Sequence, residues 1–142
     1  MRAVVLQHRG GYDGTDGAQA ALEEAARLAS ELRDDVLAVF AHHINRLGGE
    51  VRDYEESVRE IGARRLAEAE QRLTAAGVPA RTEAVDLAPA EGLIEAADRV
   101  DARMIVVGSY GERPLKSALV GSTPARLLHL SERPVLVVRA RT

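Results

Sequence analysis

The sequence predicts an α/β fold in which an open, doubly wound five-stranded parallel sheet carries helices on both faces. Short apolar runs alternate with stretches of helical periodicity along the whole chain, which is typical of βαβ units. The 46% of apolar residues are mainly Ala, Val and Leu, with one Phe and no Trp. Such aliphatic composition suits a parallel sheet that is buried between two layers of helices.

The five predicted strands are short apolar runs at residues 3–6, 36–41, 78–85, 104–107 and 135–138. The four predicted helices separate them, with apolar residues spaced three or four apart, at residues 22–32, 54–73, 89–100 and 124–130. Gly77 stands where a C-terminal glycine ends the long helix, and Pro89 stands where the next helix opens. This strict alternation is the reason for expecting the open parallel sheet.

Length and composition limit the classes of function. The 142 residues are expected to form one domain, 1–142, and the formal net charge of −3 gives no attraction for nucleic acid or an anionic membrane. The absence of cysteine excludes disulfides and thiolate metal sites. Without a signal-peptide core or an apolar run of membrane-spanning length, we expect a cytoplasmic protein.

A glycine-marked segment follows the fourth predicted strand and is the strongest functional signal. Gly108, Gly111 and Gly121 have no Cβ, so they can take positive φ and approach a ligand closely, and Ser122-Thr123 lead into the last helix. Free N–H groups at a helix start favour an anion, which indicates phosphate binding. The alternative is an ordinary helix start, with Ser122 or Thr123 as N-cap and Pro124 at the first helical position.

Catalytic residues are not predicted. Ser109 lacks the glycine spacing of a hydrolase nucleophile elbow, because glycines must stand two residues away on each side. His42 and His43 are adjacent at the end of the second predicted strand, and neighbouring strand residues point to opposite faces, which disfavours one shared metal ion. We therefore expect His42 and His43 to be solvated loop residues.

Three separated motifs resemble the universal stress protein family. The pattern Gly108-x-x-Gly111, nine residues, Gly121-Ser122 is similar to that family's nucleotide loop. Residues 12–15, Tyr-Asp-Gly-Thr, resemble its first loop, and residues 131–138 resemble its closing segment. The resemblance therefore covers nearly the whole chain.

The resemblance implies a strand order of 3-2-1-4-5, a cleft between strands one and four, and ATP as the ligand of many members. By resemblance, Asp13 lies near the ribose or a phosphate-bound Mg²⁺, and the backbone around Phe40 and Ala41 meets the adenine. The loop residues that would hold the ribose and phosphates are Gly108, Ser109, Gly111, Gly121, Ser122 and Thr123.

The first strand departs from the family pattern, in which an apolar run ends directly at the aspartate. Here residues 7–11, Gln-His-Arg-Gly-Gly, intervene before Asp13, and a buried central strand should not contain such a run. Either the strand stops near Gln7 and His8 takes the place of Asp13, or the glycines replace apolar strand residues.

These observations predict a small ATP-binding stress-response or regulatory protein. The rival functions are a slow ATPase or nucleotidyl transferase in the same cleft, and a dimerisation module whose cleft is empty. Because no base or arginine finger is placed by the sequence, we expect at most slow hydrolysis. Val135 to Val138 is apolar on both faces and would lie at a sheet edge, so we also expect a homodimer through this strand.

Overall fold

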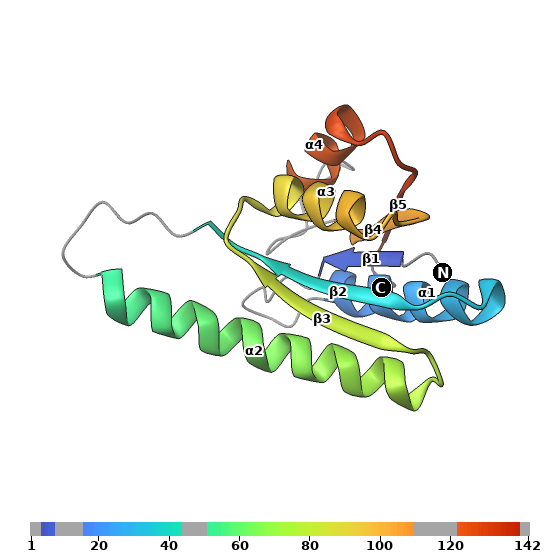
Figure 1. Cartoon of the computed structure of the whole chain (residues 1–142), viewed down its shortest axis with the longest axis horizontal. Helices are drawn as coiled ribbons and strands as arrows, with labels where there is room; N and C mark the ends of the chain where they lie inside the picture. Colours follow the sequence, from blue (N-terminus) through green and yellow to red (C-terminus); the bar gives the residue numbers. More distant parts are fainter. Residues whose placement is uncertain (1–3, 8–15, 44–50, 110–121, 140–142) are drawn as a thin grey trace.

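A computed structural model describes residues 4–7, 16–43, 51–109 and 122–139 of the chain. Five parallel strands form one sheet in the order β3-β2-β1-β4-β5, with helices on both faces (Figure 1). The strands are β1 Val4–Gln7, β2 Val36–Ala41, β3 Ala80–Val85, β4 Met104–Gly108 and β5 Val135–Val138. The helices are α1 Asp16–Leu32, α2 Val51–Ala75, α3 Pro89–Arg99 and α4 Ser122–Leu130. The predicted α/β class with parallel strands is confirmed.

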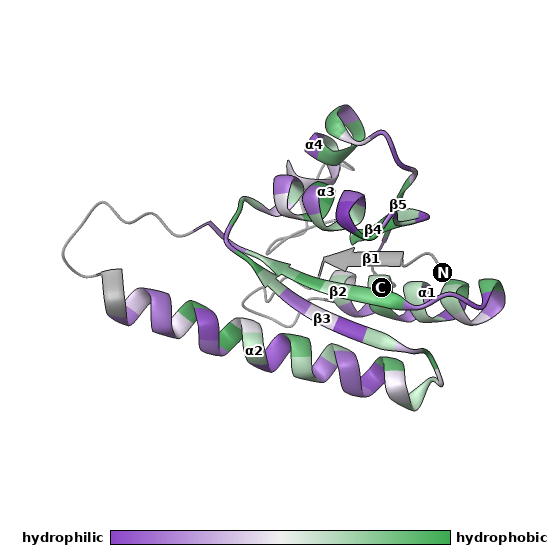
Figure 2. Cartoon of the chain, viewed as in Figure 1, coloured by the Kyte–Doolittle hydropathy of each residue, from purple (hydrophilic) through white to green (hydrophobic). Residues whose placement is uncertain are grey.

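Strand β2 is buried along its whole length and divides two cores (Figure 2). Its side chains alternate, so Ala38 and Phe40 face α1 and α2, whereas Val39 and Ala41 face α3. The first core is completed by apolar residues of α1 and α2 such as Leu22. The second is completed by α3 and by the inward face of α4.

Backbone chemistry explains where β3 begins. Residues 78–85 were the predicted strand, but the strand starts at Ala80. Gly77 takes a φ of 76° after α2, and the Val78 N–H donates back to the Leu73 carbonyl at 2.9 Å, as in a helix C-cap. Pro79 then has no N–H for a ladder. Its carbonyl nevertheless accepts from Val36 at 3.0 Å and starts the contact with β2.

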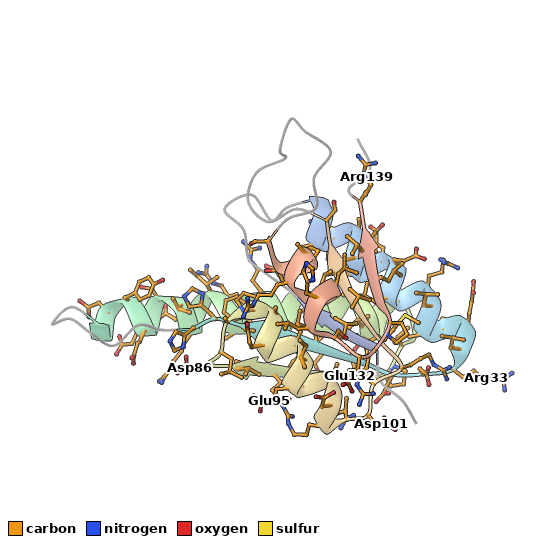
Figure 3. All side chains as sticks on the ribbon, turned by 90° about the horizontal axis from the view of Figure 1, so that it is seen from above. Arg33, Asp86, Glu95, Asp101, Glu132 and Arg139 are labelled. Atoms are coloured by element: carbon orange, nitrogen blue, oxygen red, sulfur yellow. The ribbon has the colours of Figure 1, made fainter. Side chains whose placement is uncertain are left out.

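Ion pairs join elements at the amino end of the sheet. The buried Asp34 carboxylate accepts from Arg103 at 2.6 Å, and Asp35 accepts from Arg81 at 3.3 Å. Figure 3 shows Asp101 and Arg33 toward this end, and Asp86 toward the opposite one. These bridges join the starts of β2, β3 and β4 to one another. Among the described helices, none is long and apolar enough to cross a membrane.

Candidate functional site

The winding direction of the sheet reverses at β1, and this is the point where open α/β sheets bind ligands. Strand β1 pairs with β2 on one side and β4 on the other. The β1 pairing ends at Gln7 with Val39 and at Leu6 with Val106. β2 and β4 each continue two residues past their last described pairing with β1, to Ala41 and Gly108.

Gly108 is the last residue of β4 and stands against the start of α1. A Cβ there would lie 2.9 Å from the carbonyl carbon and oxygen of Gly17. The absence of a side chain at Gly108 is therefore required by the packing of α1, whether or not a ligand is bound. Gly108 does not use the positive φ that a glycine permits, because it stays in the β4 ladder opposite Val138, and among the described glycines Gly77 has positive φ.

Ser109 follows directly and is 4% exposed. Its N–H donates to the Val138 carbonyl at 2.8 Å, so the hydrogen bonding between β4 and β5 extends one residue past the strand. The Ser109 Oγ has no hydrogen-bond partner among the residues that the structure describes. A buried hydroxyl without a partner is costly, and a ligand oxygen or nitrogen at this edge would satisfy it.

The first turn of α4 carries the predicted hydroxyls. The helix begins at Ser122, two residues before the expected Pro124, so Ser122 and Thr123 lie within its first turn and Pro124 is its third residue. Proline is tolerated there because N–H groups of a first turn have no intrahelical acceptor. Ser122 is exposed and Thr123 is half-buried, whereas Pro124 is buried.

An ion pair holds this helix on the fold. The Arg126 guanidinium of α4 donates to the Glu91 carboxylate of α3, and this hydrogen bond lowers the pKa of Glu91 below its ordinary value of 4.5. The pair joins the first turn of α3 to the second turn of α4. It therefore fixes the position of Ser122 and Thr123 relative to the sheet.

Phe40 and Ala41 present only their backbones to the carboxyl edge. The Phe40 ring points toward α2, where a Cβ on Gly62 would lie 2.7 Å from it. The Ala41 methyl points the other way, 2.7 Å from where a Cβ on Gly92 of α3 would lie. The expectation that these residues meet adenine through the backbone stays a prediction.

Several predicted positions lie outside the described residues. These are Asp13, Gly111, Gly121 and the alternative strand-end residue His8. Gly108, Ser109 and α4 belong to the described part of the chain, whereas the middle of the glycine loop lies outside it. It also holds no group of three His, Asp or Glu residues that could bind a metal ion.

The two histidines after β2 diverge. His42 Nε2 lies 3.2 Å from the Tyr54 hydroxyl of α2, and His43 Nδ1 lies 3.5 Å from the Asp86 carboxylate after β3. The contact with Asp86 was not predicted, since only nearby sequence positions were considered for partners. The signal was available: Asp86 follows the third strand as the histidines follow the second, and parallel neighbours end at one edge.

Comparisons with known proteins agree with this geometry. The model of the universal stress protein family matches residues 10–139. The universal stress protein YxiE of Bacillus subtilis is 31% identical over 142 aligned residues, covering 89% of this chain and 94% of that protein.

Solved structures of universal stress proteins also resemble this chain. A universal stress protein crystallised with cAMP is 25% identical, with a TM-score of 0.73 and coverage of 99% of this chain and 100% of that one. The Archaeoglobus fulgidus universal stress protein in complex with dAMP, at 19% identity, shares the fold with a TM-score of 0.70 over 97% of this chain and 98% of that one. The family-model match and the relative YxiE show that the chain belongs to the universal stress protein family.

Proposed function

We propose that this protein is a single-domain ATP-binding regulatory module whose nucleotide site is the carboxyl edge around β1 and β4. The observation that carries the proposal is the buried Ser109 Oγ, which has no partner among the described residues and stands where β4 leaves the sheet. The winding reversal at β1 and the hydroxyls in the first turn of α4 support the same edge. The relative in complex with cAMP supports an adenine nucleotide.

In this proposal the base lies against the backbone of Phe40 and Ala41, and the phosphates lie between Gly108 and the start of α4. Gly111, Gly121, Ser122 and Thr123 complete the phosphate contacts. Asp13 would bind the ribose or an Mg²⁺ ion on the phosphates. Carboxylate oxygens suit Mg²⁺, which is usually held by one or two carboxylates and substrate phosphates.

Titration calorimetry with ATP and Mg²⁺ tests this site. Gly121→Val should abolish binding, because its side chain would intrude on the phosphate path. Ser109→Ala should weaken the binding of ATP by roughly three- to tenfold, which is the range expected for the loss of one hydrogen bond. Ser30→Ala, on the exposed surface of α1, is the matched control. Unchanged ATP affinity in a folded Gly121→Val protein would show that the assignment is wrong.

Binding, rather than turnover, is the proposed activity. Phosphoryl transfer requires a residue that orients the nucleophile as well as a metal ion, and Asp13 is the one candidate from the sequence. We expect phosphate release well below the ~10 s⁻¹ typical of enzymes. Multiple turnovers near that rate would instead favour the ATPase alternative.

We also propose a homodimer through β5. This strand lies at one edge of the sheet, and all four of its residues are half-buried, so each leaves apolar surface exposed. Antiparallel pairing with a second copy would satisfy the free backbone groups and close by two-fold symmetry.

Sedimentation at micromolar concentration tests the dimer. A mass near the 15.3 kDa monomer would refute it. Val137→Pro removes a backbone donor from β5 and should dissociate the dimer, whereas Val137→Thr keeps the donor and should not. An ATP titration of the monomeric variant separates the two proposals, because the nucleotide edge does not include β5.

A further inference from the structure

The backbone of β3 has an open outer edge. Among the described residues β3 pairs with β2 alone, so it is the edge strand opposite β5 (Figure 1). The carbonyls of Pro79 and Val85 both accept hydrogen bonds from β2, each at 3.0 Å. Backbone groups of successive strand residues point to opposite edges. The residues in between, Ala80, Thr82 and Ala84, therefore turn their N–H and C=O groups away from the sheet.

A cavity of about 620 Å³ runs along this edge, between β3 and α2. Residues 82–86 line it without a break, so side chains from both faces of the strand border the same space. The cavity therefore reaches the edge of β3 and not one face alone. From residue 82 to residue 86 a strand rises about 13 Å, so an added strand of about five residues would match the length of the cavity.

The wall of the cavity that α2 forms leaves room for side chains. Ala63 and Ala67 of this wall carry only methyl groups. Ala80 packs in the core on the α2 face of the sheet, and by alternation Thr82 and Ala84 point to the same face. Both are nevertheless exposed. The space between the helix and the end of β3 can therefore take every second side chain of an added strand.

The charged residues of β3 do not protect its edge. Exposed edge strands usually carry charges that discourage pairing with another chain. Arg81 is instead held by Asp35 at 3.3 Å, and Glu83 is held by Arg99 at 2.7 Å. The residues that turn their backbone outward are uncharged. The edge is thus open to a further strand.

The two ends of the α2 wall carry opposite charges. Arg59 and Glu70 both line the cavity, and neither forms an ion pair with another residue that the structure describes. They are separated by three helical turns, or about 16 Å. Because α2 follows β2 and runs back along the sheet, Arg59 lies toward the carboxyl edge and Glu70 toward the amino edge (Figure 1). An extended chain with an acidic and a basic residue at matching positions would complement both.

We infer that this cavity binds an extended segment of a partner protein, which adds to β3 as an antiparallel sixth strand. The outward N–H and C=O groups of Thr82 and Ala84 bind its main chain, as in other cases of strand addition. Antiparallel pairing is the more stable arrangement per residue. In this direction the segment has an acidic residue near its amino end, against Arg59, and a basic residue four positions later, against Glu70. A β-branched apolar residue between them packs on the α2 wall.

A fluorescent heptapeptide tests the inference by anisotropy. Ser-Glu-Thr-Val-Thr-Lys-Ser, with both ends blocked, places its Glu, Val and Lys on one face. We expect it to saturate one site per chain. Ser-Lys-Thr-Val-Thr-Glu-Ser has the same composition with the charges exchanged, and we expect it to bind about two- to fivefold more weakly. Arg59→Gln should reduce this preference, and Arg64→Gln, on the same helix outside the cavity, should not.

Proline substitutions test the main-chain pairing. Thr82→Pro and Ala84→Pro each remove one outward N–H and leave the hydrogen bonds to β2 in place, which an edge strand tolerates. Each should weaken the first peptide at least about threefold, as the loss of one hydrogen bond predicts. Thr82→Val and Ala84→Val keep the N–H and are the matched controls. Circular dichroism checks that each variant folds.

Filling the cavity from α2 is a second test that leaves β3 unchanged. Ala67→Trp should weaken the first peptide to a similar extent, and Ala75→Trp, at the end of α2 outside the cavity, should not.

Three results would overturn the inference. The first is the absence of saturable binding to the unmodified protein, and the second is full affinity in both proline variants and in Ala67→Trp. The third is a sedimentation mass that falls in Ala84→Pro but not in Ala84→Val, because a second copy of the chain would then occupy the edge. The peptide titrations contain no nucleotide, so their outcome does not depend on the proposed nucleotide site.

Discussion

The two faces of the sheet are packed in different ways, although the same strand supplies both. On the α3 and α4 face, β2 presents Ala41, and Gly92 of α3 leaves the space that the Ala41 methyl occupies. On the α1 and α2 face, β2 presents Phe40, with Gly62 beside the ring. Small groups on both partners give close packing on the first face. A large ring against a small-residue helix leaves a cavity of about 620 Å³ beside α2, and a second cavity of about 480 Å³ lies between α1 and the carboxyl end of α2.

Ion pairs follow the same division. Arg27 of α1 pairs with Glu24 and Glu31 of its own helix, so these pairs support α1 without joining it to another element. On the other face, Arg99 of α3 reaches Glu83 of β3, and Arg126 of α4 reaches Glu91 of α3. The α3 and α4 face is thus tied together by side chains as well as by packing. We expect it to be the more rigid of the two.

Truncating a buried leucine on each face should give the largest effect. Leu93 and Leu73 are both fully buried, but Leu73 borders the 480 Å³ cavity. Leu93→Ala should lower the free energy of unfolding by about 3–5 kcal/mol, and Leu73→Ala by about 2–3 kcal/mol, since part of its surroundings is already unfilled. Urea denaturation measures both values. A larger loss for Leu73→Ala would contradict the difference between the faces.

Replacing Gly92 or Gly62 by alanine should give the next largest effect on stability. In Gly92→Ala the new Cβ meets the Ala41 methyl, which cannot rotate away, so we expect a net loss of about 1–2 kcal/mol despite the gain of helix propensity. In Gly62→Ala the Phe40 ring can turn toward the cavity, and the helix-propensity gain of about 1 kcal/mol should offset the strain. Thermal melts measure the stability of both variants, and equal losses of stability would refute the predicted difference between Gly92 and Gly62.

A double-mutant cycle sharpens the account of Gly62. Phe40→Leu removes the ring that the new methyl would touch, so the combined Gly62→Ala and Phe40→Leu protein should be more stable than the sum of single effects predicts, by about 0.5–1 kcal/mol. Gly92→Ala combined with Phe40→Leu is the control and should be additive, because these residues lie on opposite faces. Additivity in the first cycle would show that ring and helix do not clash.

The smallest effect concerns pH. The hydrogen bond from Arg126 lowers the pKa of Glu91 in the folded state, so its stabilisation is fully present above the ordinary value of 4.5 and is lost as the pH falls through the lowered pKa. Glu91→Gln should reduce stability by less than about 1 kcal/mol at neutral pH, with the difference disappearing in acid. Glu56→Gln on α2 is the control. Melting temperatures between pH 3 and 7 measure the trend, and a pH-independent difference would contradict it.

The sequence alone determined the α/β class and the approximate positions of the elements. The residues of β2 and β5 match their predicted ranges, because uninterrupted apolar runs have few alternatives in a sheet that is covered by helices on both faces. Element ends were less certain: Pro79 and the cap at Gly77 shortened β3, and α4 began before its proline. The helix C-cap between Val78 and Leu73 and the missing N–H of Pro79 set the start of β3, and the periodicity of apolar residues does not record such backbone hydrogen bonding.

The tertiary structure alone decided what the side chains near the carboxyl edge touch. Gly108 suggested a ligand contact in the sequence, but the fold places it against Gly17 of α1. The sequence around Phe40 and His42 does not indicate a cavity, because the cavity forms only where α2 packs over this part of the sheet. Such contacts join residues that are far apart in the chain, and their geometry depends on how closely each helix can approach the strands. A sequence pattern records periodicity, while the distance between packed elements follows from all the side chains between them.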